Sequence, residues 1–369
     1  MKFSIDREEL SRALRIVSGV IERKQQQSPS LSSVFLTLTD NGLEVVATDQ
    51  EIELIATVQP NEVLRTGSAL IPCRKLNDIC RVLPEKAEIV IDSTAEKTLI
   101  KAGQSKFALS ALSSKQFPKL GDFVGQHNFS VSRFVFTRLL EKTAFAMAEQ
   151  DVRYFLNGTL LEVGMDFLRA VAADGHRLAT QTMSFDGADI APIKIIIPRK
   201  GVLEILRVLG AGRTDTATII LGNNNFRVLC DGLSVTTALL GGRYPDYEKL
   251  VSLQGDKVVR GQREQLKEAL HRASALLSEK FKGVRLRLSQ GWMQILAYNP
   301  EKDEVEENLA VDFDGAEVEL GFNAKYLLDF LSSAVADTVK MTFSEPNGSV
   351  MLEEQDGSQG KCIVMPMRM

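Results

Sequence analysis

The chain has 369 residues, of which 44% are hydrophobic and 25% charged, a composition that is ordinary for globular protein and that excludes disordered, collagen-like and coiled-coil chains. This length predicts two or three domains, each large enough to bury its own core. The net charge of −4, from 44 Lys and Arg against 48 Asp and Glu, gives by itself no indication of a nucleic-acid partner.

Six amphipathic helices are predicted along the chain, because apolar residues recur at i, i+3 or i+4 and i+7. They cover residues 6–21, 73–83, 133–147, 199–209, 262–277 and 323–334. Alternating apolar runs such as 34–39 lie between them and are joined at turn signals, namely Asp40-Asn41-Gly42, Ala102-Gly103, Asp231-Gly232 and Asp356-Gly357. Such hairpins predict antiparallel sheets and an α+β fold, and they exclude Rossmann and TIM-barrel architectures, in which strands and helices alternate singly.

Four landmarks recur three times in the same order, at intervals of about 125 residues, and predict an internal triplication. An apolar strand before the first helix of each repeat begins near residues 3, 129 and 258. The other landmarks are a strand ending at Asp49, Asp174 and Asn299, an apolar strand leading into the second helix (70–75, 196–200, 320–325), and a closing Pro118, Pro245 and Pro366. We therefore predict three similar domains, each with two helices packed on antiparallel sheets, at residues 1–125, 126–253 and 254–369.

Targeting and metal-binding segments are not predicted. The first eight residues carry charges where a secretory signal needs apolar residues, and the longest apolar runs are far shorter than the roughly 20 residues that span a bilayer. The four cysteines and three histidines have no spacing typical of metal ligands. We expect a cytoplasmic protein with reduced thiols, no metal, no cofactor and no membrane association.

The charges are unevenly distributed. The six predicted helices hold 16 Lys and Arg against 9 Asp and Glu, so the rest of the chain carries an excess of acidic residues. This segregation is compatible with a basic helical face turned towards phosphates, and equally with an ordinary solvated helix surface. Basic runs interleaved with aromatic residues are missing, so any DNA contact is expected to be weak and independent of sequence.

The best candidate for catalysis is the segment Asp174-Gly175-His176-Arg177, because a His beside a carboxylate and a guanidinium suits proton transfer or phosphate binding. The other repeats have Asp49-Gln50-Glu51 and Asn299-Pro300-Glu301 at this place. A feature of one repeat alone indicates a binding site there more than a reaction shared by the repeats. A plain turn is the remaining interpretation.

The segments 150–158, 174–178, 197–201 and 364–368 together closely resemble the bacterial DNA polymerase III beta subunits, the sliding clamp family. The resemblance covers essentially the whole chain. It implies a DNA-clamp fold and a non-catalytic, head-to-tail homodimer that closes as a six-domain ring around duplex DNA. Twelve helices of ~10 Å diameter, side by side, would enclose a circumference of about 120 Å and a bore of roughly 30 Å.

The resemblance also implies functional residues and partners. The peptide-binding groove would comprise Leu156, Ala173, Gly175, His176, Arg177, Leu178, Pro245, Leu250, Ser349, Val364, Met365, Pro366, Met367 and Arg368. The DNA-facing residues would be Arg23, Lys24, Gln150 and Tyr154. The dimer interface would use Lys97, Lys101, Lys106, Phe107, Leu276, Leu277, Glu301 and Glu304. Short linear peptides from the polymerase III catalytic subunit, the clamp loader, other polymerases and mismatch-repair proteins would occupy the groove, and during replication the protein would associate with the nucleoid.

Three features depart from the family pattern. Ala173 stands where many members carry Thr, Lys249 where others have Arg, and the loop at 25–32 is unusually polar.

Two other functions stay open. One alternative is an enzyme acting on a nucleic acid or a phosphorylated substrate, with His176 as acid or base and Arg177 as phosphate clamp. The other is a monomeric peptide-binding scaffold.

Overall fold

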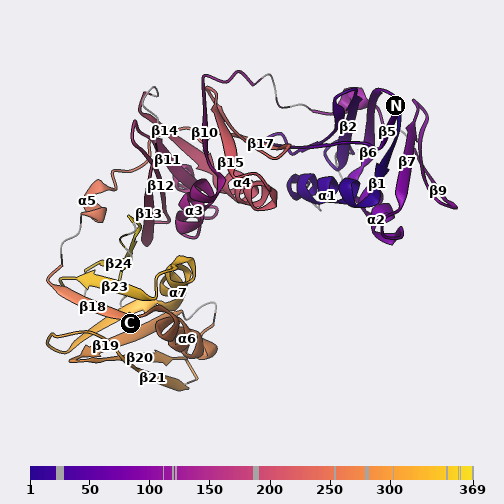
Figure 1. Ribbon diagram of the computed structural model, residues 1–369. Coiled ribbons are helices and arrows are strands. Elements are labelled where there is room, and N and C mark those ends of the chain that lie inside the picture. Colours follow the sequence, from indigo (N-terminus) through magenta and orange to yellow (C-terminus); the bar gives the residue numbers. More distant parts are fainter. Residues whose placement is uncertain are drawn as a thin grey trace. The chain divides into compact units, whose positions relative to one another are not determined.

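The computed structural model describes residues 1–21, 29–110, 112–118, 120, 123–185, 191–252, 255–278, 282–301, 303–345, 348–355, 357 and 359–367. The chain packs into two compact units, and Figure 1 labels their helices and strands. The first unit comprises Met1–Thr137 and Lys200–Leu239, and the second comprises Arg138–Arg199 and Leu240–Met369. Each unit therefore contains the contacts between two successive repeats, the first unit those of repeats one and two and the second unit those of repeats two and three.

The six predicted helices are confirmed. They are α1 (Arg7–Val17), α2 (Cys73–Val82), α3 (Arg133–Ala144), α4 (Arg199–Ala211), α6 (Arg263–Ala273) and α7 (Ala324–Ser333). The short helix α5 (Glu248–Val251) was not predicted, and single 3₁₀ turns form η1 (Ser18–Val20), η2 (Ser114–Gln116), η3 (Tyr154–Leu156) and η4 (Ser274–Leu276). The apolar stripe that predicted α1 is buried, as Leu10, Leu14 and Val17 show, and this burial stabilises the helix against the sheets by about 1.5–3 kcal/mol per large side chain.

Antiparallel strands fill each repeat. The first repeat has β1 (Lys2–Asp6), β2 (Ser33–Thr39), β3 (Gly42–Thr48), β4 (Ile52–Val58), β5 (Glu62–Arg65), β6 (Gly67–Pro72), β7 (Glu88–Ser93), β8 (Lys97–Ala102) and β9 (Ser105–Ser110). The second has β10 (His127–Ser132), β11 (Gly158–Val163), β12 (Phe167–Ala173), β13 (Arg177–Ser184), β14 (Ile193–Pro198), β15 (Thr216–Leu221), β16 (Asn225–Cys230) and β17 (Leu233–Ala238). The third has β18 (Lys257–Gln262), β19 (Gly283–Ser289), β20 (Trp292–Tyr298), β21 (Glu304–Ala310), β22 (Val318–Asn323), β23 (Thr338–Phe343), β24 (Val350–Glu354) and β25 (Lys361–Val364). The hairpin turns predicted at 40–42, 102–103 and 231–232 are confirmed, whereas Asp356 of the fourth lies outside the described residues.

Two sheets continue from one repeat into the next. The first unit holds the sheets β5-β1-β7-β8-β9 and β10-β15-β16-β17-β4-β3-β2-β6, and the second holds β14-β11-β12-β13-β25-β24-β23-β18 and β21-β20-β19-β22. In the first unit Val235 of β17 pairs with Leu54 of β4, and in the second Leu178 of β13 pairs with Ile363 of β25. Each junction between repeats is therefore a continuous antiparallel ladder with main-chain hydrogen bonds.

One arginine at the start of the first helix occupies the same role in all three repeats. Arg7 donates to the Cys80 carbonyl at 2.7 Å, Arg133 to the Leu209 carbonyl at 3.0 Å, and Arg263 to the Ala336 carbonyl at 3.0 Å. These carbonyls lie at or just past the ends of the second helices, where backbone acceptors lack helical partners.

These contacts account for part of the basic charge counted in the predicted helices. Three of the counted arginines serve as intramolecular caps, and this role places their charge against backbone carbonyls. The exposed bases Arg74, Lys75 and Arg81 of α2 remain as charge directed to solvent.

Candidate functional site

The turn between β12 and β13 is built on an Asp side chain. The Asp174 Oδ1 atom accepts hydrogen bonds from the backbone N–H groups of His176 and Arg177 at 2.9 and 3.0 Å. Gly175 has a φ of 90°, a left-handed conformation in which a residue without Cβ is favoured. The local sequence Asp-Gly thus fixes where β13 begins.

The other repeats have equivalent turns. Asp49 Oδ1 accepts from the backbone N–H of Ile52 at 2.7 Å, and Asn299 Oδ1 accepts from that of Asp303 at 2.8 Å. Gln50, at the position of Gly175, also has a positive φ of 79°. The Asp174 carboxylate therefore has a structural role in the turn, and the other two repeats share that role. Its second oxygen accepts from Arg177 Nε at 3.0 Å, so both oxygens bond groups of the turn itself.

An apolar patch lies beside this turn. We define the patch as Leu156, Ala173, Leu178, Leu250 and Met365. Leu156 and Leu178 are buried, and Ala173 packs partly buried against the same cluster. Leu250 lies exposed in α5, a helix that contacts β25. Met365 is also exposed and donates its backbone N–H to the His176 carbonyl at 2.9 Å.

The structure brings most of the predicted groove residues to this patch. Gly175 and His176 lie exposed in the adjoining turn, and Pro245 lies exposed before α5. Ser349 precedes Val350, which pairs with Val364 of β25. Pro366 and Met367 follow β25, and the Met367 N–H donates to the Gly321 carbonyl at 2.8 Å. Arg368 lies outside the described residues.

Two tyrosines that were not among the predicted groove residues lie buried beside the patch. Tyr244 and Tyr247 belong to the same buried cluster as Leu156, and they also line a pocket of about 550 Å³ with Glu162 at its wall. The Tyr247 hydroxyl donates to Glu162 at 2.7 Å, and burial raises the pKa of Tyr247 to about 12. The segment Tyr-Pro-Asp-Tyr at 244–247 was a readable signal, since it closes the second repeat.

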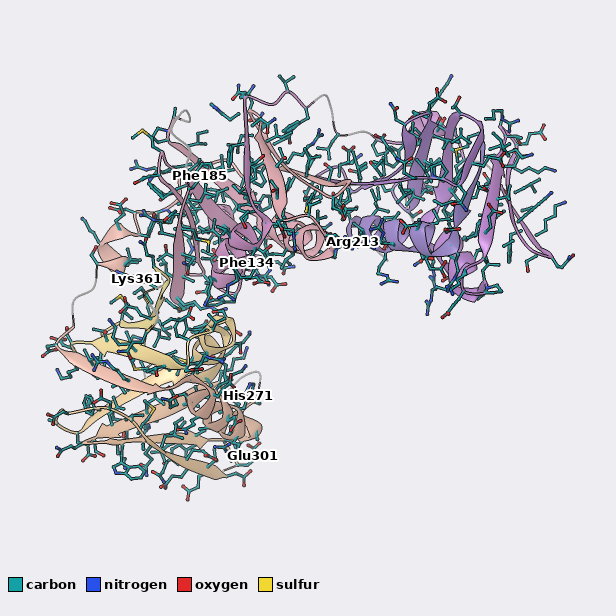
Figure 2. All side chains as sticks on the ribbon, in the orientation of Figure 1. Phe134, Phe185, Arg213, His271, Glu301 and Lys361 are labelled. Atoms are coloured by element: carbon teal, nitrogen blue, oxygen red, sulfur yellow. The ribbon has the colours of Figure 1, made fainter. Side chains whose placement is uncertain are left out.

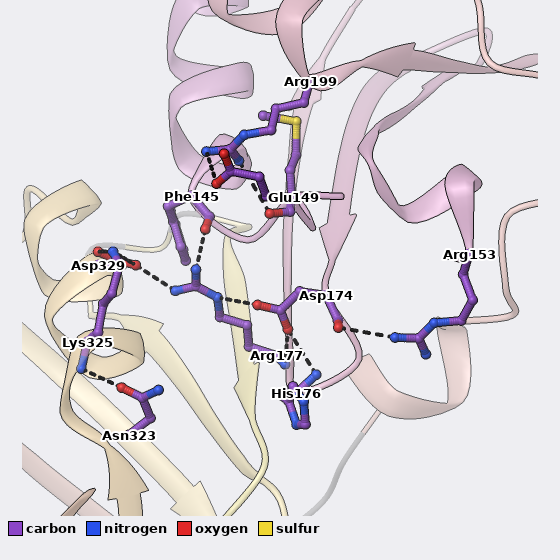
Figure 3. Close-up of polar contacts among 11 residues, drawn as sticks. Phe145, Glu149, Arg153, Asp174, His176, Arg177, Arg199, Asn323, Lys325 and Asp329 are labelled. Atoms are coloured by element: carbon purple, nitrogen blue, oxygen red, sulfur yellow. Dashed lines mark hydrogen bonds and ion pairs between the residues drawn. The ribbon is translucent and has the colours of Figure 1, made fainter. Parts of the chain in front are cut away.

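The Arg177 side chain points away from solvent (Figure 3). The side chain is 7% exposed, and its Nη1 donates to Asp329 Oδ2 at 2.7 Å. Its Nη2 donates to the Phe145 carbonyl, and the ring of Tyr326 lies 4.4 Å from the guanidinium carbon. The resemblance implies that Arg177 belongs to the peptide-binding groove, whereas the structure directs its guanidinium into the junction between the second and third repeats.

Three of the four cysteines are buried, unreactive thiols. Burial raises the pKa of Cys73 and Cys80 to about 11 and that of Cys362 to about 12, so these thiols are protonated and poor nucleophiles at neutral pH. Among the described residues, groups of three or more His, Cys, Asp or Glu side chains able to hold a metal ion are absent. No helix in the described part of the chain is both long and apolar enough to cross a membrane.

The predicted DNA-facing residues are only partly described. Arg23 and Lys24 lie outside the described residues. Gln150 is exposed with a φ of 57°, and Tyr154 is exposed in η3 with its ring 5.7 Å from that of Phe155. Both residues precede the buried Leu156, so one short loop carries a DNA-facing candidate and the start of the patch.

The predicted interface residues cluster at two sheet edges. Lys97 and Lys101 lie on β8, and Lys106 and Phe107 on its neighbour β9, the last strand of the five-stranded sheet. Glu304 begins β21, the edge strand of the four-stranded sheet, and Glu301 lies exposed just before it (Figure 2). Leu276 and Leu277 are half-buried at and just after η4.

Comparison with known proteins agrees with this architecture. Three family models match in succession, namely the N-terminal domain of the DNA polymerase III beta subunit at residues 1–121, its central domain at 130–246 and its C-terminal domain at 250–368. The beta sliding clamps of Pseudomonas putida and Escherichia coli K12 are 42% and 40% identical, each over 100% of both chains. The crystal structure of the DNA polymerase III subunit beta from Pseudomonas aeruginosa is 41% identical, with a TM-score of 0.93 over 100% of both chains.

The fold and the patch thus define a triplicated protein of the DNA-clamp class. More narrowly, the chain belongs to the DNA polymerase III beta subunit family, the beta sliding clamps.

Proposed function

We propose that the protein is a DNA polymerase processivity factor, a homodimeric ring that encircles duplex DNA and tethers the replicative polymerase. The observation that carries the proposal is that two strands, β9 and β21, lie at the edges of their sheets. The second repeat presents β17 to β4 of the first, and the third presents β25 to β13 of the second. By the order of strands in the sheets, the first-repeat equivalent of β17 and β25 is β9, and the third-repeat equivalent of β4 and β13 is β21.

Both β9 and β21 end their sheets, which makes them suited to pair between copies. In this assembly β9 of one copy continues the sheet of β21 in the other, as in the two internal junctions. Such a contact is heterologous and generates a closed ring when its rotation closes. We propose closure at two copies, which gives six domains, with boundaries at 1–125, 126–253 and 254–369.

Side-chain chemistry supports the same contact. The hairpin of β8 and β9 offers Lys97, Lys101 and Lys106, whereas β21 and the residues just before it offer Glu304 and Glu301. Phe107 would pack against Leu276 and Leu277. Opposite charges around an apolar centre favour correct association and still allow the ring to open.

Enclosure explains how retention and sliding coexist. A closed ring holds the duplex without strong contacts, and weak, salt-sensitive phosphate contacts break easily at each step. Exposed bases such as Arg74 and Arg81, together with Gln150 and Tyr154, fit such contacts, and we keep Arg23 and Lys24 among the proposed DNA-facing residues. The protein would act without catalysis, in the cytoplasm and at the nucleoid.

The apolar patch would receive short linear peptides, and with the adjoining turn and 364–368 it would form the predicted groove. Flexible Met365 and Met367 suit a surface that accepts several partners, here the polymerase III catalytic subunit, the clamp loader, other polymerases and mismatch-repair proteins. A Pseudomonas aeruginosa sliding clamp, 41% identical to this chain with a TM-score of 0.94, has been solved bound to griselimycin. We propose that griselimycin also binds this chain, at the patch.

The experiment that tests the ring is the oligomeric state by light scattering. Wild type should be a dimer, and Phe107→Asp, or Leu276→Ala with Leu277→Ala, should give a folded monomer. Leu64→Asp is the matched control, because Leu64 is an exposed apolar residue on β5, at the opposite edge of the same sheet as β9. A monomeric wild type would favour the scaffold alternative, and a dimer disrupted only by Leu64→Asp would place the interface elsewhere.

A further inference from the structure

Arg177 connects three segments that are far apart in the chain. Its Nε bonds Asp174 in its own turn at 3.0 Å, and its Nη1 bonds Asp329 of α7 at 2.7 Å. Its Nη2 bonds the Phe145 carbonyl just past the end of α3. The guanidinium therefore joins the second repeat to a helix of the third (Figure 3), and a planar group with fixed donors suits this branched geometry.

The same side chain supports the wall of the apolar patch. Arg177 holds the Asp174 carboxylate, whose other oxygen fixes the backbone of the turn. The His176 carbonyl in this turn accepts the backbone N–H of Met365, and the next residue, Leu178, is part of the buried cluster. A continuous set of hydrogen bonds thus runs from Asp329 to Met365.

Direct contact between a peptide and the Arg177 guanidinium would disrupt this set. All three of its nitrogens are engaged, and only 7% of the side chain is exposed. Turning the guanidinium towards the patch would leave Asp329 and the Phe145 carbonyl without this donor, and buried polar groups that lose their partners are costly.

We propose that Arg177 is a positioning residue that couples occupancy of the apolar patch to docking of the third repeat onto the second. The inference rests on the proposed peptide binding at the patch. Because linkage is reciprocal, a ligand that favours the ordered turn also tightens the contact between Arg177 and α7, and loss of that contact weakens the ligand.

The test uses Asp329→Asn in the full-length dimer, with griselimycin as the probe and calorimetry as the readout. Asp329 lies in α7 and is not a patch residue, so coupling predicts roughly 5- to 20-fold weaker binding. Lys325→Gln is the matched control, because Lys325 is the other ion-pair partner of Asp329, at 2.8 Å, and is largely exposed. This control should bind griselimycin within about twofold of wild type, as expected for an exposed pair worth little.

Arg177→Lys completes a double-mutant cycle with Asp329→Asn. Coupling predicts that the two losses of affinity do not add, since each variant breaks the same contact. Hydrogen exchange in α7 should slow when griselimycin binds wild type and should not slow in Asp329→Asn. Such a change in ligand-induced protection is a readout that loss of stability alone would not produce.

Two results would overturn the proposal, and they are distinguishable. Unchanged affinity in Asp329→Asn, together with a large loss in Arg177→Ala, would mean that the guanidinium contacts the ligand directly and that coupling is absent. A folded wild-type dimer that does not bind griselimycin would overturn peptide binding at the patch and the coupling with it.

Discussion

The two junctions between repeats share a plan but differ in how deeply their charges are buried. At the first junction Lys200 of α4 forms an ion pair with Asp49, whose turn is the counterpart of the Asp174 turn. At the second junction Arg177 bonds Asp329, and Lys142 of α3 forms a further ion pair with Glu354. The side chains of Lys142 and Glu354 are 8% and 3% exposed, whereas at the first junction Asp49 is 6% exposed but its partner Lys200 is 38% exposed.

This difference concerns the turn beside the proposed binding site. The first junction holds its turn through a lysine from the neighbouring repeat, and the turn bears Gln50. The second junction holds its turn through Arg177 from within the turn itself, so that Gly175 and His176 are presented beside the patch. The more buried junction is the one that supports the proposed ligand site, and a rigid support improves the positioning of binding residues.

The largest predicted effect separates the two junctions by stability. Lys142→Met leaves the buried Glu354 carboxylate without its cation and should lower the free energy of unfolding by about 3–5 kcal/mol. Lys200→Met should cost only about 1 kcal/mol, because Lys200 is partly exposed and the backbone N–H groups of Glu51 and Ile52 still bond the buried Asp49 carboxylate. Urea denaturation of both variants measures the difference, and equal losses would contradict the contrast between the junctions.

The same buried pair should make the second junction sensitive to acid. Burial alone would raise the pKa of Glu354, but Lys142 and the backbone N–H groups of Val335 and Ala336 hold its pKa below the ordinary value of 4.5. The contribution of the ionised Glu354 to the free energy of unfolding is therefore complete above about pH 4.5 and declines as the pH falls below that value. Urea midpoints between pH 6 and 3.5 should fall more steeply for wild type than for Glu354→Gln, and parallel curves would refute the assignment.

A smaller effect is expected at the turn of the second repeat. Gly175→Ala forces a side chain into a φ of 90° and puts its Cβ 2.6 Å from the Arg153 guanidinium. The strain should cost about 1–3 kcal/mol, and griselimycin should bind more weakly because the turn carries His176. Calorimetry together with thermal unfolding checks both effects. Unchanged affinity in a folded variant would show that the turn does not shape the patch.

The smallest predicted effect is a gain at the counterpart turn. Gln50 already has a φ of 79°, so Gln50→Gly should relieve left-handed strain and stabilise the first unit by about 0.5–1 kcal/mol after the entropic cost of glycine. Griselimycin binding should not change. A destabilised variant would mean that the Gln50 side chain contributes contacts that outweigh the strain.

Local patterns predicted the helices because their signals lie within a few residues of one another. The stripes in α1 and α6, the Asp-Gly turns and the threefold recurrence of landmarks all depend on short spacing. The same recurrence contained an unused signal, since Arg7, Arg133 and Arg263 stand at one place in each repeat and all cap a second helix.

Partners distant in sequence could not be predicted in this way. Lys142 and Glu354 are separated by 212 residues, and Arg177 and Asp329 by 152. Nothing in the periodicity of α3 or α7 indicates which basic residue meets which acidic one, because pairing depends on how the repeats dock. The sequence therefore indicates the turn to which Arg177 belongs but not the direction in which its side chain points.

The most direct test of the whole account is retention on DNA of different topology. The protein is loaded onto nicked circular DNA with a compatible clamp loader and ATP, and bound protein is measured before and after a single cut of the circle. Enclosure predicts retention on the circle at moderate salt and rapid loss once the DNA is linear. Equal retention on both forms would mean ordinary surface binding and would contradict the sliding clamp.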